Sequence, residues 1–245
     1  MVTLKGNLPT WLTVSGSGNA GVVTTFAGSD SPGDKDDTGT IASFHNPRGI
    51  ALDKSGNIYV ADWRNHKIRK ISASGEVTTL AGSGLSGFAD GKGTEARFNY
   101  PSGLEVDAAG NVYVADTGNH RIRKISASGV VTTIAGSGQT GSTDGVGTAA
   151  RFSNPSGIAL DGSGNIYVGD LDNHKIRKIS ILGVVTTLAG SGLKGSTDGV
   201  GTVARFNNPS DVAVDGSGNV YVSDFNNHKI RKISTAGVVT TLAGS

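Results

Sequence analysis

Short apolar runs separated by glycine-rich turns follow one another along most of the chain. In residues 154–190 these runs are rich in Ile, Val and Tyr, and polar residues alternate with them or bound them. Short runs of β-branched and aromatic residues between Gly, Asn and Asp are typical of strands. The pattern predicts consecutive strands over residues 157–161, 165–168, 175–179 and 184–188.

The same pattern returns with a fixed period. Neighbouring members of one proline series stand 54 residues apart, at Pro47, Pro101, Pro155 and Pro209. A constant period of this size indicates a repeat architecture. The first strand leads into the second through a tight turn at Asp161–Asn165, so the strands form an antiparallel meander, which is one blade of a β-propeller. A β-solenoid is the alternative, but its coils are normally shorter and lack tight hairpins.

We therefore predict an all-β propeller of four-stranded antiparallel blades, with complete blades near residues 46–82, 100–136, 154–190 and 208–244. Residues 22–245 follow the repeat, and Val22–Phe26 matches the fourth strand of a unit, which predicts an additional N-terminal strand. Residues 1–21 depart from the repeat. The pattern leaves open whether the blades close into a ring or form an open fragment of a larger propeller. An open arc would allow self-association through its ends.

Composition supports strands and turns, and it narrows the chemistry. The chain has 38 glycines and no cysteine among its 245 residues, and its formal net charge is +2. The lack of cysteine excludes disulfides, thiolate metal sites and cysteine nucleophiles. The small charge provides no global field that would attract nucleic acid or a membrane. Residues 1–20 contain no apolar run long enough for a signal peptide or a membrane span.

Three features found among the units resemble NHL repeats: the Pro-x-Gly-Ile opening, the Gly-Asn-Ile-Tyr-Val-Ala-Asp run, and Asn-His followed by Lys or Arg and Ile. The resemblance covers nearly all of residues 46–245. The first family letter matches Asn65, Asn119, Asn173 and Asn227, and a histidine follows each of them. The resemblance implies a propeller but no single activity, because NHL propellers include RNA-binding and protein-binding domains, lyases and extracellular bacterial modules. Residues 7–14 resemble the end of an Ig-like module of bacterial surface proteins.

Strand order predicts which face could bind a ligand. The loops between the second and third strands and the long loops that link successive units share one face, here called the top face. These loops vary most between copies, whereas the turns on the opposite face barely change, and exposed aromatic residues supply contact area. The candidate ligand-binding residues are Trp63, Arg64, Phe88, Thr117, Leu171, Asp172, Phe225 and Asn226. The long linking loops predict one helical turn each, anchored by Phe98, Phe152 or Phe206.

Several repeated polar residues have a functional and a structural interpretation. One histidine per blade could ligate zinc, but symmetry spreads His66, His120, His174 and His228 around a ring, so we expect each to hydrogen-bond within a blade turn. Asp62 and its equivalents are expected to cap the loop that follows them. The Asp161-x-Ser163-x-Asn165 turns suggest calcium, although hairpin formation explains the same residues. The Lys and Arg residues of the third strand are expected to keep solvated heads.

These observations favour a non-catalytic binding or scaffold module, extracellular or on the cell surface, that recognises a protein or carbohydrate ligand. No cofactor, metal or membrane span is expected, and nucleic acid is disfavoured. The alternative is an NHL-type metal-dependent lyase or lactonase, which needs acidic or histidine ligands at the central channel. The first strands open there with Gly49, Gly103, Gly157 and Asp211, so a single copy offers a carboxylate. An RNA-binding NHL domain is the second alternative.

Overall fold

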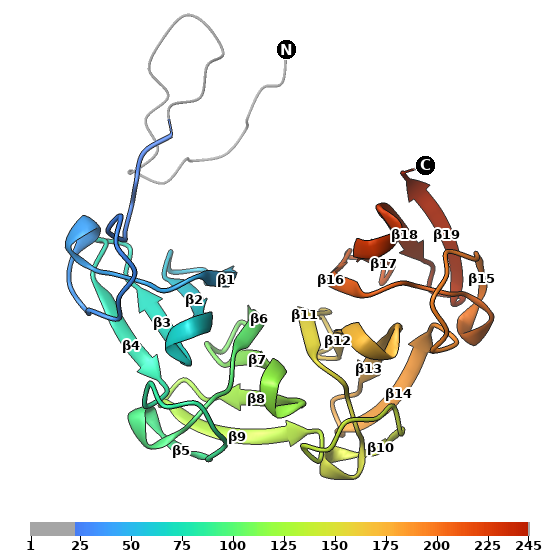
Figure 1. Cartoon of the computed structure of the whole chain (residues 1–245), viewed down its shortest axis with the longest axis horizontal. Coiled ribbons are helices and arrows are strands. Elements are labelled where there is room, and N and C mark those ends of the chain that lie inside the picture. Colours follow the sequence, from blue (N-terminus) through green and yellow to red (C-terminus); the bar gives the residue numbers. More distant parts are fainter. Residues whose placement is uncertain (1–22, 245) are drawn as a thin grey trace, which may run out of the picture.

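Four antiparallel β-sheets stand side by side along an arc in the computed structural model, which describes residues 23–244. Each sheet contains the four strands of one repeat, with the first strand nearest the centre of the arc and the fourth farthest out among them (Figure 1). The first strands are β1 (Pro47–Leu52), β6 (Pro101–Val106), β11 (Pro155–Leu160) and β16 (Pro209–Val214), and each contacts the next. The prediction of an all-β propeller is confirmed.

The other main strands follow in the predicted order. Blade 1 continues with β2 (Ile58–Asp62), β3 (Lys67–Ile71) and β4 (Val77–Ala81). Blade 2 continues with β7 (Val112–Asp116), β8 (Arg121–Ile125) and β9 (Val130–Ala135). Blade 3 continues with β12 (Ile166–Asp170), β13 (Lys175–Ile179) and β14 (Val184–Ala189). Blade 4 continues with β17 (Val220–Asp224), β18 (Lys229–Ile233) and β19 (Val238–Ala243).

The long linking loops cover the outer edge of the blade that they enter. Short strands β5 (Gly91–Lys92), β10 (Gly145–Val146) and β15 (Gly199–Val200) pair with β9, β14 and β19, which adds a fifth strand to three sheets. One 3-10 turn follows each strand, namely η3 (Gly93–Glu95), η5 (Gly147–Ala149) and η7 (Gly201–Val203), and η1 (Gly39–Ile41) precedes blade 1. Phe98, Phe152 and Phe206 are fully buried. The predicted turn with its phenylalanine anchor is confirmed.

Neighbouring blades pack most closely near the centre of the arc. A Cβ atom on Gly49 would lie 2.3 Å from the carbonyl oxygen of Ser102, and one on Gly103 would lie 2.3 Å from that of Ser156. Glycine is therefore required where the innermost strands approach each other. Farther out, Phe98 packs in one buried cluster that contains residues of blades 1 and 2. Each blade thus buries its faces against its neighbours, as repeat units generally do.

In each blade, a buried arginine of the third strand links that strand to the second strand and to the linking loop. Arg123 of β8 is fully buried, and its two terminal nitrogens donate to Asp116 of β7 at 2.7 Å and to Asp90 of the linking loop at 2.6 Å. The loop carbonyl oxygens of Ala89 and Arg97 accept two further bonds. The same ion pairs recur for Arg69, Arg177 and Arg231. Solvated heads were therefore the wrong expectation for these arginines, because the linking loop covers them.

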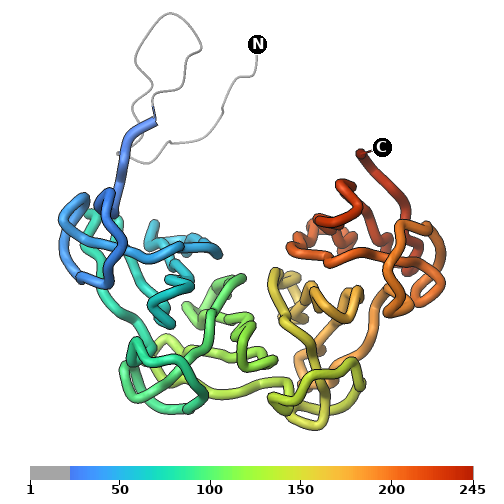
Figure 2. The backbone as a smooth tube through the Cα atoms, viewed as in Figure 1, coloured from blue at the N-terminus to red at the C-terminus, as the bar shows by residue number. Residues whose placement is uncertain are grey.

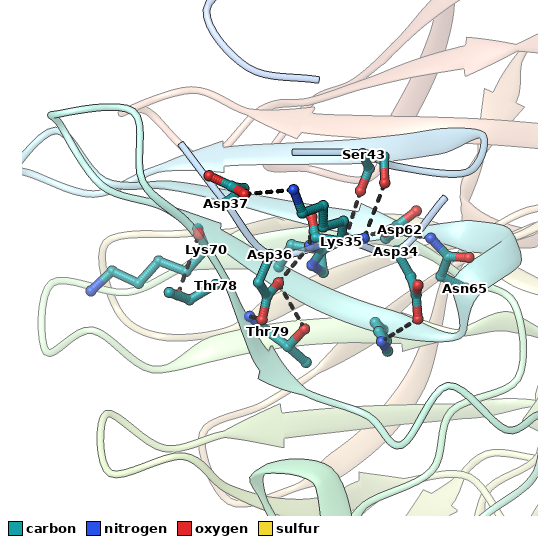
Figure 3. Close-up of polar contacts among 12 residues, drawn as sticks. Asp34, Lys35, Asp36, Asp37, Ser43, Asp62, Asn65, Lys70, Thr78 and Thr79 are labelled. Carbon is teal, nitrogen blue, oxygen red and sulfur yellow. Dashed lines mark hydrogen bonds and ion pairs between the residues drawn. The ribbon is translucent and has the colours of Figure 1, made fainter. Parts of the chain in front are cut away.

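The aspartate at the end of each second strand also has other partners than expected. Asp62 accepts the backbone N–H of His45 at 2.7 Å with one oxygen, and the side chains of Asn65 and Arg69 with the other. No side chain caps the 3-10 turn that follows it. The capping prediction is wrong: the carboxylate joins the entry of the first strand to the second and third strands. Figure 3 shows this part of blade 1 together with its loop residue Asp36, which accepts bonds from Thr79.

The additional strand predicted over Val22–Phe26 does not form in residues 23–26, and Val22 lies outside the described residues. Residues 1–21, with the predicted Ig-like remnant, lie outside them as well. Phe26 packs instead beside a buried cluster of blade 1 that contains Val60, Ile71 and Val77. In every blade the fourth strand forms its backbone hydrogen bonds with the third strand of the same blade. Within residues 23–244, no strand of that kind lies beside residues 23–26.

The first and last blades lie at opposite ends of the arc (Figure 2). Ile50 of blade 1 is 68% exposed, whereas Leu104, its equivalent in blade 2, is 4% exposed. At the other end Ile230 is 40% exposed, whereas its equivalent Ile122 is fully buried. The described residues therefore present one uncovered blade face at each end, and self-association through these faces stays a prediction.

Candidate functional site

The loops between the second and third strands share one backbone geometry. Each begins as a 3-10 turn, namely η2 (Trp63–Asn65), η4 (Thr117–Asn119), η6 (Leu171–Asn173) and η8 (Phe225–Asn227). The next residue is a left-handed histidine, with φ between 53° at His66 and 56° at His228. The Asn119 side chain donates to the carbonyl oxygen of Gly87, at the tip of a linking loop, at 2.7 Å, and equivalent bonds recur in the other blades. Both kinds of loop therefore lie on the top face.

Three of the histidines connect neighbouring blades. The Nδ1 atom of His66 accepts the backbone N–H of Tyr100 at 3.0 Å, and His120 and His174 accept the equivalent amides at 3.1 Å. Burial lowers the pKa of all three rings, which favours the neutral form that accepts this bond. The predicted structural hydrogen bond exists, but it joins two blades rather than the ends of one turn.

The top face between blades 1 and 2 carries a group of contacting aromatic and cationic side chains. The guanidinium carbon of Arg48 lies 4.0 Å from the centre of the Trp63 ring, and that of Arg64 lies 5.5 Å from it. The Tyr100 ring centre lies 4.6 Å from that of Trp63 and 4.6 Å from that of His66. We call Arg48, Trp63, Arg64 and Tyr100 the aromatic–cation cluster.

Every member of the aromatic–cation cluster departs from what the other copies have at its position. The other blades have serine in place of Arg48, and glycine, aspartate or asparagine in place of Arg64. The other linking loops have asparagine in place of Tyr100, and Trp63 is the single tryptophan of its series. Sequence reasoning selected Trp63 and Arg64 but missed the other two. The same comparison between copies, applied at positions 48 and 100, would have found them.

Tyr100 is an unusual residue type for its backbone conformation. Its φ is 50°, in the left-handed region that Asn tolerates and that is strained for a bulky side chain. Its side chain is 40% exposed, so burial gives little compensation. Residues held in such conformations cluster at functional sites. Asn46, Asn154 and Asn208 adopt the same conformation, so the strain comes from the tyrosine at position 100, and it supports the cluster as a candidate site.

The same positions form a polar network over blades 3 and 4. One oxygen of Asp172 accepts the side-chain amide of Asn154 at 2.5 Å, and the other accepts that of Asn208 at 3.1 Å. Asn226 donates in turn to the side-chain oxygen of Asn208 at 2.9 Å. We call Asn154, Asp172, Asn208 and Asn226 the amide–carboxylate network. Its carboxylate is engaged by donors of the protein itself.

The structure separates the remaining candidate residues. The Thr117 hydroxyl donates to the carbonyl oxygen of Pro155 at 2.7 Å, so this side chain bridges blades 2 and 3. Phe88 lies in a linking loop, 45% exposed, with the guanidinium carbon of Arg121 3.8 Å from its ring centre. Leu171 is half-buried, and Phe225 is 65% exposed beside the uncovered face of blade 4. The candidates that the structure brings together are Trp63 with Arg64, and Asp172 with Asn226 through Asn208.

The mouth of the central channel is a shallow hollow of about 190 Å³, whose lining includes Arg48 and Asp211. Desolvation raises the pKa of Asp211, and desolvation with the nearby charge of Asp211 raises that of Glu105, which sequence reasoning did not single out. Other first strands have alanine in place of Glu105. Residues 23–244 contain no group of three or more His, Asp or Glu residues arranged to hold a metal ion.

The hairpin turns on the opposite face use their aspartates internally. Asp161 accepts the backbone amides of Ser163 and Asn165 with one oxygen, and the Asn165 amide and the Tyr167 hydroxyl with the other. In blade 4 the equivalent bonds from Asn219 and its neighbours lower the pKa of Asp215 to about 2. These donors engage the carboxylate that a calcium ion would need, as the hairpin interpretation predicts.

Among the described helical turns, none is long and apolar enough to cross a membrane.

Known proteins share the repeat and the fold. The family model for the NHL repeat matches residues 44–71, 98–125, 152–179 and 206–233. NHL repeat-containing protein 2 of Bos taurus is 32% identical over 255 residues, which cover 89% of this chain and 35% of the relative. The chain thus spans about a third of the length of the curated relatives that it matches first.

Two solved structures show the fold alone. An auxiliary nutrient binding protein of Bacteroides thetaiotaomicron has a TM-score of 0.66 at 20% identity, over 88% of this chain and 56% of that one. Streptogramin B lyase has a TM-score of 0.57 at 17% identity, over 81% of this chain and 54% of that one. Propellers of this shape therefore include both a binding protein and an enzyme.

Proposed function

Because the chain contains four NHL repeats that fold as propeller blades, we propose that it is a non-catalytic binding module that recognises a protein or glycan ligand with its top face. One contrast carries the proposal. The repeated Asp and Arg residues, and three of the four repeated histidines, are engaged in contacts that build the blades. On the top face, the loops between the second and third strands differ at Trp63, Arg64 and their equivalents, which places exposed or half-exposed side chains of different chemistry on one framework. A surface of this kind varies in what it contacts without loss of fold.

The test compares two faces of one protein. The top-face variant carries Trp63→Thr, Leu171→Thr and Phe225→Thr, since blade 2 has threonine at this position. The control carries Ser55→Ala, Ser163→Ala and Ser217→Ala on the opposite face, where blade 2 has alanine. Both variants and the wild type are screened on arrays of purified glycans and proteins. We expect each wild-type signal to weaken by about tenfold or more in the top-face variant and to persist in the control.

Two results would overturn the proposal. In one, the array signals survive the top-face substitutions or disappear in the opposite-face control. In the other, the purified protein contains a stoichiometric metal ion at the channel, and substitution of Glu105 and Asp211 by the alanine and glycine of other blades removes both the metal and a lactone- or ester-opening activity. The second result would favour the lyase or lactonase alternative.

A further inference from the structure

We propose that the aromatic–cation cluster is a docking site for an acidic segment of a partner protein, whose carboxylates bind Arg48 and Arg64. The inference rests on the proposed function, since it uses the same top face, and it adds the chemistry of the partner. Three observations carry it: the charge of the cluster, its composition and strain, and the shape of the surface around it.

The first observation is that the two cations of the cluster are unpaired. Arg48 and Arg64 are exposed, and the ion pairs within the described residues all involve other cations. The guanidinium carbon of Arg48 lies over the Trp63 ring, 4.0 Å from its centre. A guanidinium stacked on a ring keeps its N–H donors free at the edge, where they can bind a carboxylate in a bidentate manner. The arrangement is therefore preorganised for an oxyanion.

The second observation is that the departures from the repeat converge. Two members of the cluster come from one top-face loop of blade 1, one from the first strand and one from the linking loop into blade 2, yet they form one contact group. Trp, Tyr and Arg are the residue types that dominate binding energy at protein interfaces. Tyr100 takes the left-handed conformation that asparagine has at this position in the other copies, so its bulky side chain carries strain that asparagine avoids. The other blades fold without these residues, so folding does not account for them.

The third observation favours a protein segment over a sugar or a nucleotide. Arg48 and Tyr100 lie 4.0 Å and 4.6 Å from the centre of the Trp63 ring, and Arg64 lies 5.5 Å from it, so side chains of the protein already contact this ring. A sugar ring or base would have to displace one of them in order to stack on Trp63. The adjoining hollow of about 190 Å³ is smaller than the roughly 300–1,000 Å³ typical of small-molecule pockets. A shallow surface with exposed guanidinium edges suits acidic side chains of a docked protein.

The experiment uses polymers of defined chemistry as probes. Poly-L-glutamate, polygalacturonate and poly-uridylate are titrated against the full chain in about 0.15 M salt. Trp11→Phe leaves Trp63 as the single tryptophan, so its fluorescence reports binding at the cluster. The site variant carries Arg48→Ser and Arg64→Asn, the residues of blade 4. The matched control carries Arg151→Ser and Arg205→Ser, which removes the same charge from exposed linking-loop positions.

We expect poly-L-glutamate to bind and to change the Trp63 fluorescence. Its affinity should fall by about tenfold or more in the site variant and by less than about twofold in the control. An equal loss in both variants would reveal general charge attraction and would overturn the inference, as would a failure of the wild type to bind poly-L-glutamate. Tighter binding of polygalacturonate or poly-uridylate through the two arginines would assign the site to an acidic glycan or a nucleic acid instead.

The inference and the proposed function can fail separately. A ligand from the array screen that is lost in the Trp63, Leu171 and Phe225 variant but kept in the site variant would defeat the acidic-segment inference and leave the proposed function standing. A ligand kept in both variants would defeat both. Thermal unfolding of each variant, expected to match that of the wild type, establishes that a lost signal reflects the surface and not the fold.

Discussion

The top face carries two regions that differ in chemistry and share a framework. Between blades 1 and 2, the aromatic–cation cluster presents exposed guanidinium groups, which form no ion pair within residues 23–244, beside two rings tilted against each other. Over blades 3 and 4, the amide–carboxylate network engages its one charge with amides of the protein itself. Beneath both lie the same 3-10 turns, left-handed histidines and buried arginines. The framework pairs its buried arginines with its own aspartates, which leaves the loop positions above it free to diverge.

The comparison also shows which region is available to a partner. A carboxylate that already accepts amide donors loses those bonds when it binds something else, so the network favours its present state. An exposed guanidinium without a carboxylate loses nothing comparable, and it can attract an oppositely charged partner over a distance. The aromatic–cation cluster is therefore the region in which we expect recognition to begin.

The largest expected effect tests the shared framework. Arg177→Leu leaves the carboxylates of Asp170 and Asp144 without their cation and should lower the free energy of unfolding by about 3–5 kcal/mol. Arg69→Leu, in the blade that carries most of the aromatic–cation cluster, should lower the free energy of unfolding by the same amount. Lys178→Leu, on the same strand as Arg177 but half-exposed, should change it by less than about 1 kcal/mol. Urea unfolding measures all three, and arginine effects as small as that of Lys178 would contradict the framework role.

An exchange between the two regions has the next largest expected effect. Asn154→Tyr puts a bulky residue at φ 50° and removes the amide that Asp172 accepts, so we expect a loss of about 1–2 kcal/mol. Tyr100→Asn relieves the same backbone strain but loses the ring contact with Trp63, so the net change should stay below about 1 kcal/mol. Thermal unfolding of both variants checks this. A loss above about 2 kcal/mol in Tyr100→Asn would show that the cluster serves folding.

The smallest expected effect is a pH dependence common to both regions. Burial lowers the pKa of His66, His120 and His174 in the folded protein, whereas a histidine in an unfolded chain has a pKa of about 6.5. As the pH falls below that value, the unfolded chain takes up protons that the folded chain resists. Stability is therefore highest at neutral pH and is lost as the pH falls toward the folded pKa values. Melting temperatures at about pH 7.5 and about pH 5.5 measure the loss.

The control for this dependence is a triple His66→Asn, His120→Asn and His174→Asn variant, because Asn tolerates the left-handed backbone. It should be less stable than the wild type at neutral pH and should respond less to acid. Burial also raises the pKa of the Asp116 carboxyl to about 6. Such carboxylates contribute to the pH dependence of both proteins, so comparing the variant with the wild type removes their contribution. A variant that loses as much stability in acid as the wild type would disprove the role of the histidines.

The sequence by itself determined the blade and its strand order. Apolar periodicity, glycine turns and the constant step between copies depend on neighbours along the chain, so they predicted the strands, the tight hairpins and the helical turn above Phe152. The comparison of copies also indicated the top-face loops, from which Trp63 and Arg64 were selected. These features depend on residues close together in the chain, or they recur so regularly that the strand order and the face of each loop follow from them.

Only the tertiary structure decided how the repeats interlock. Arg123 is buried because Asp90, 33 residues earlier, lies in a loop that folds over the next blade's outer edge. Tyr100 lies against His66 because a hydrogen bond joins residues 34 positions apart across a blade boundary. Periodicity assigns a residue to its place within a unit, but it does not show which units touch at that place. Burial, pairing and the aromatic–cation cluster arise from those contacts between units, because charge and ring interactions depend on distance in space and not on position in the chain.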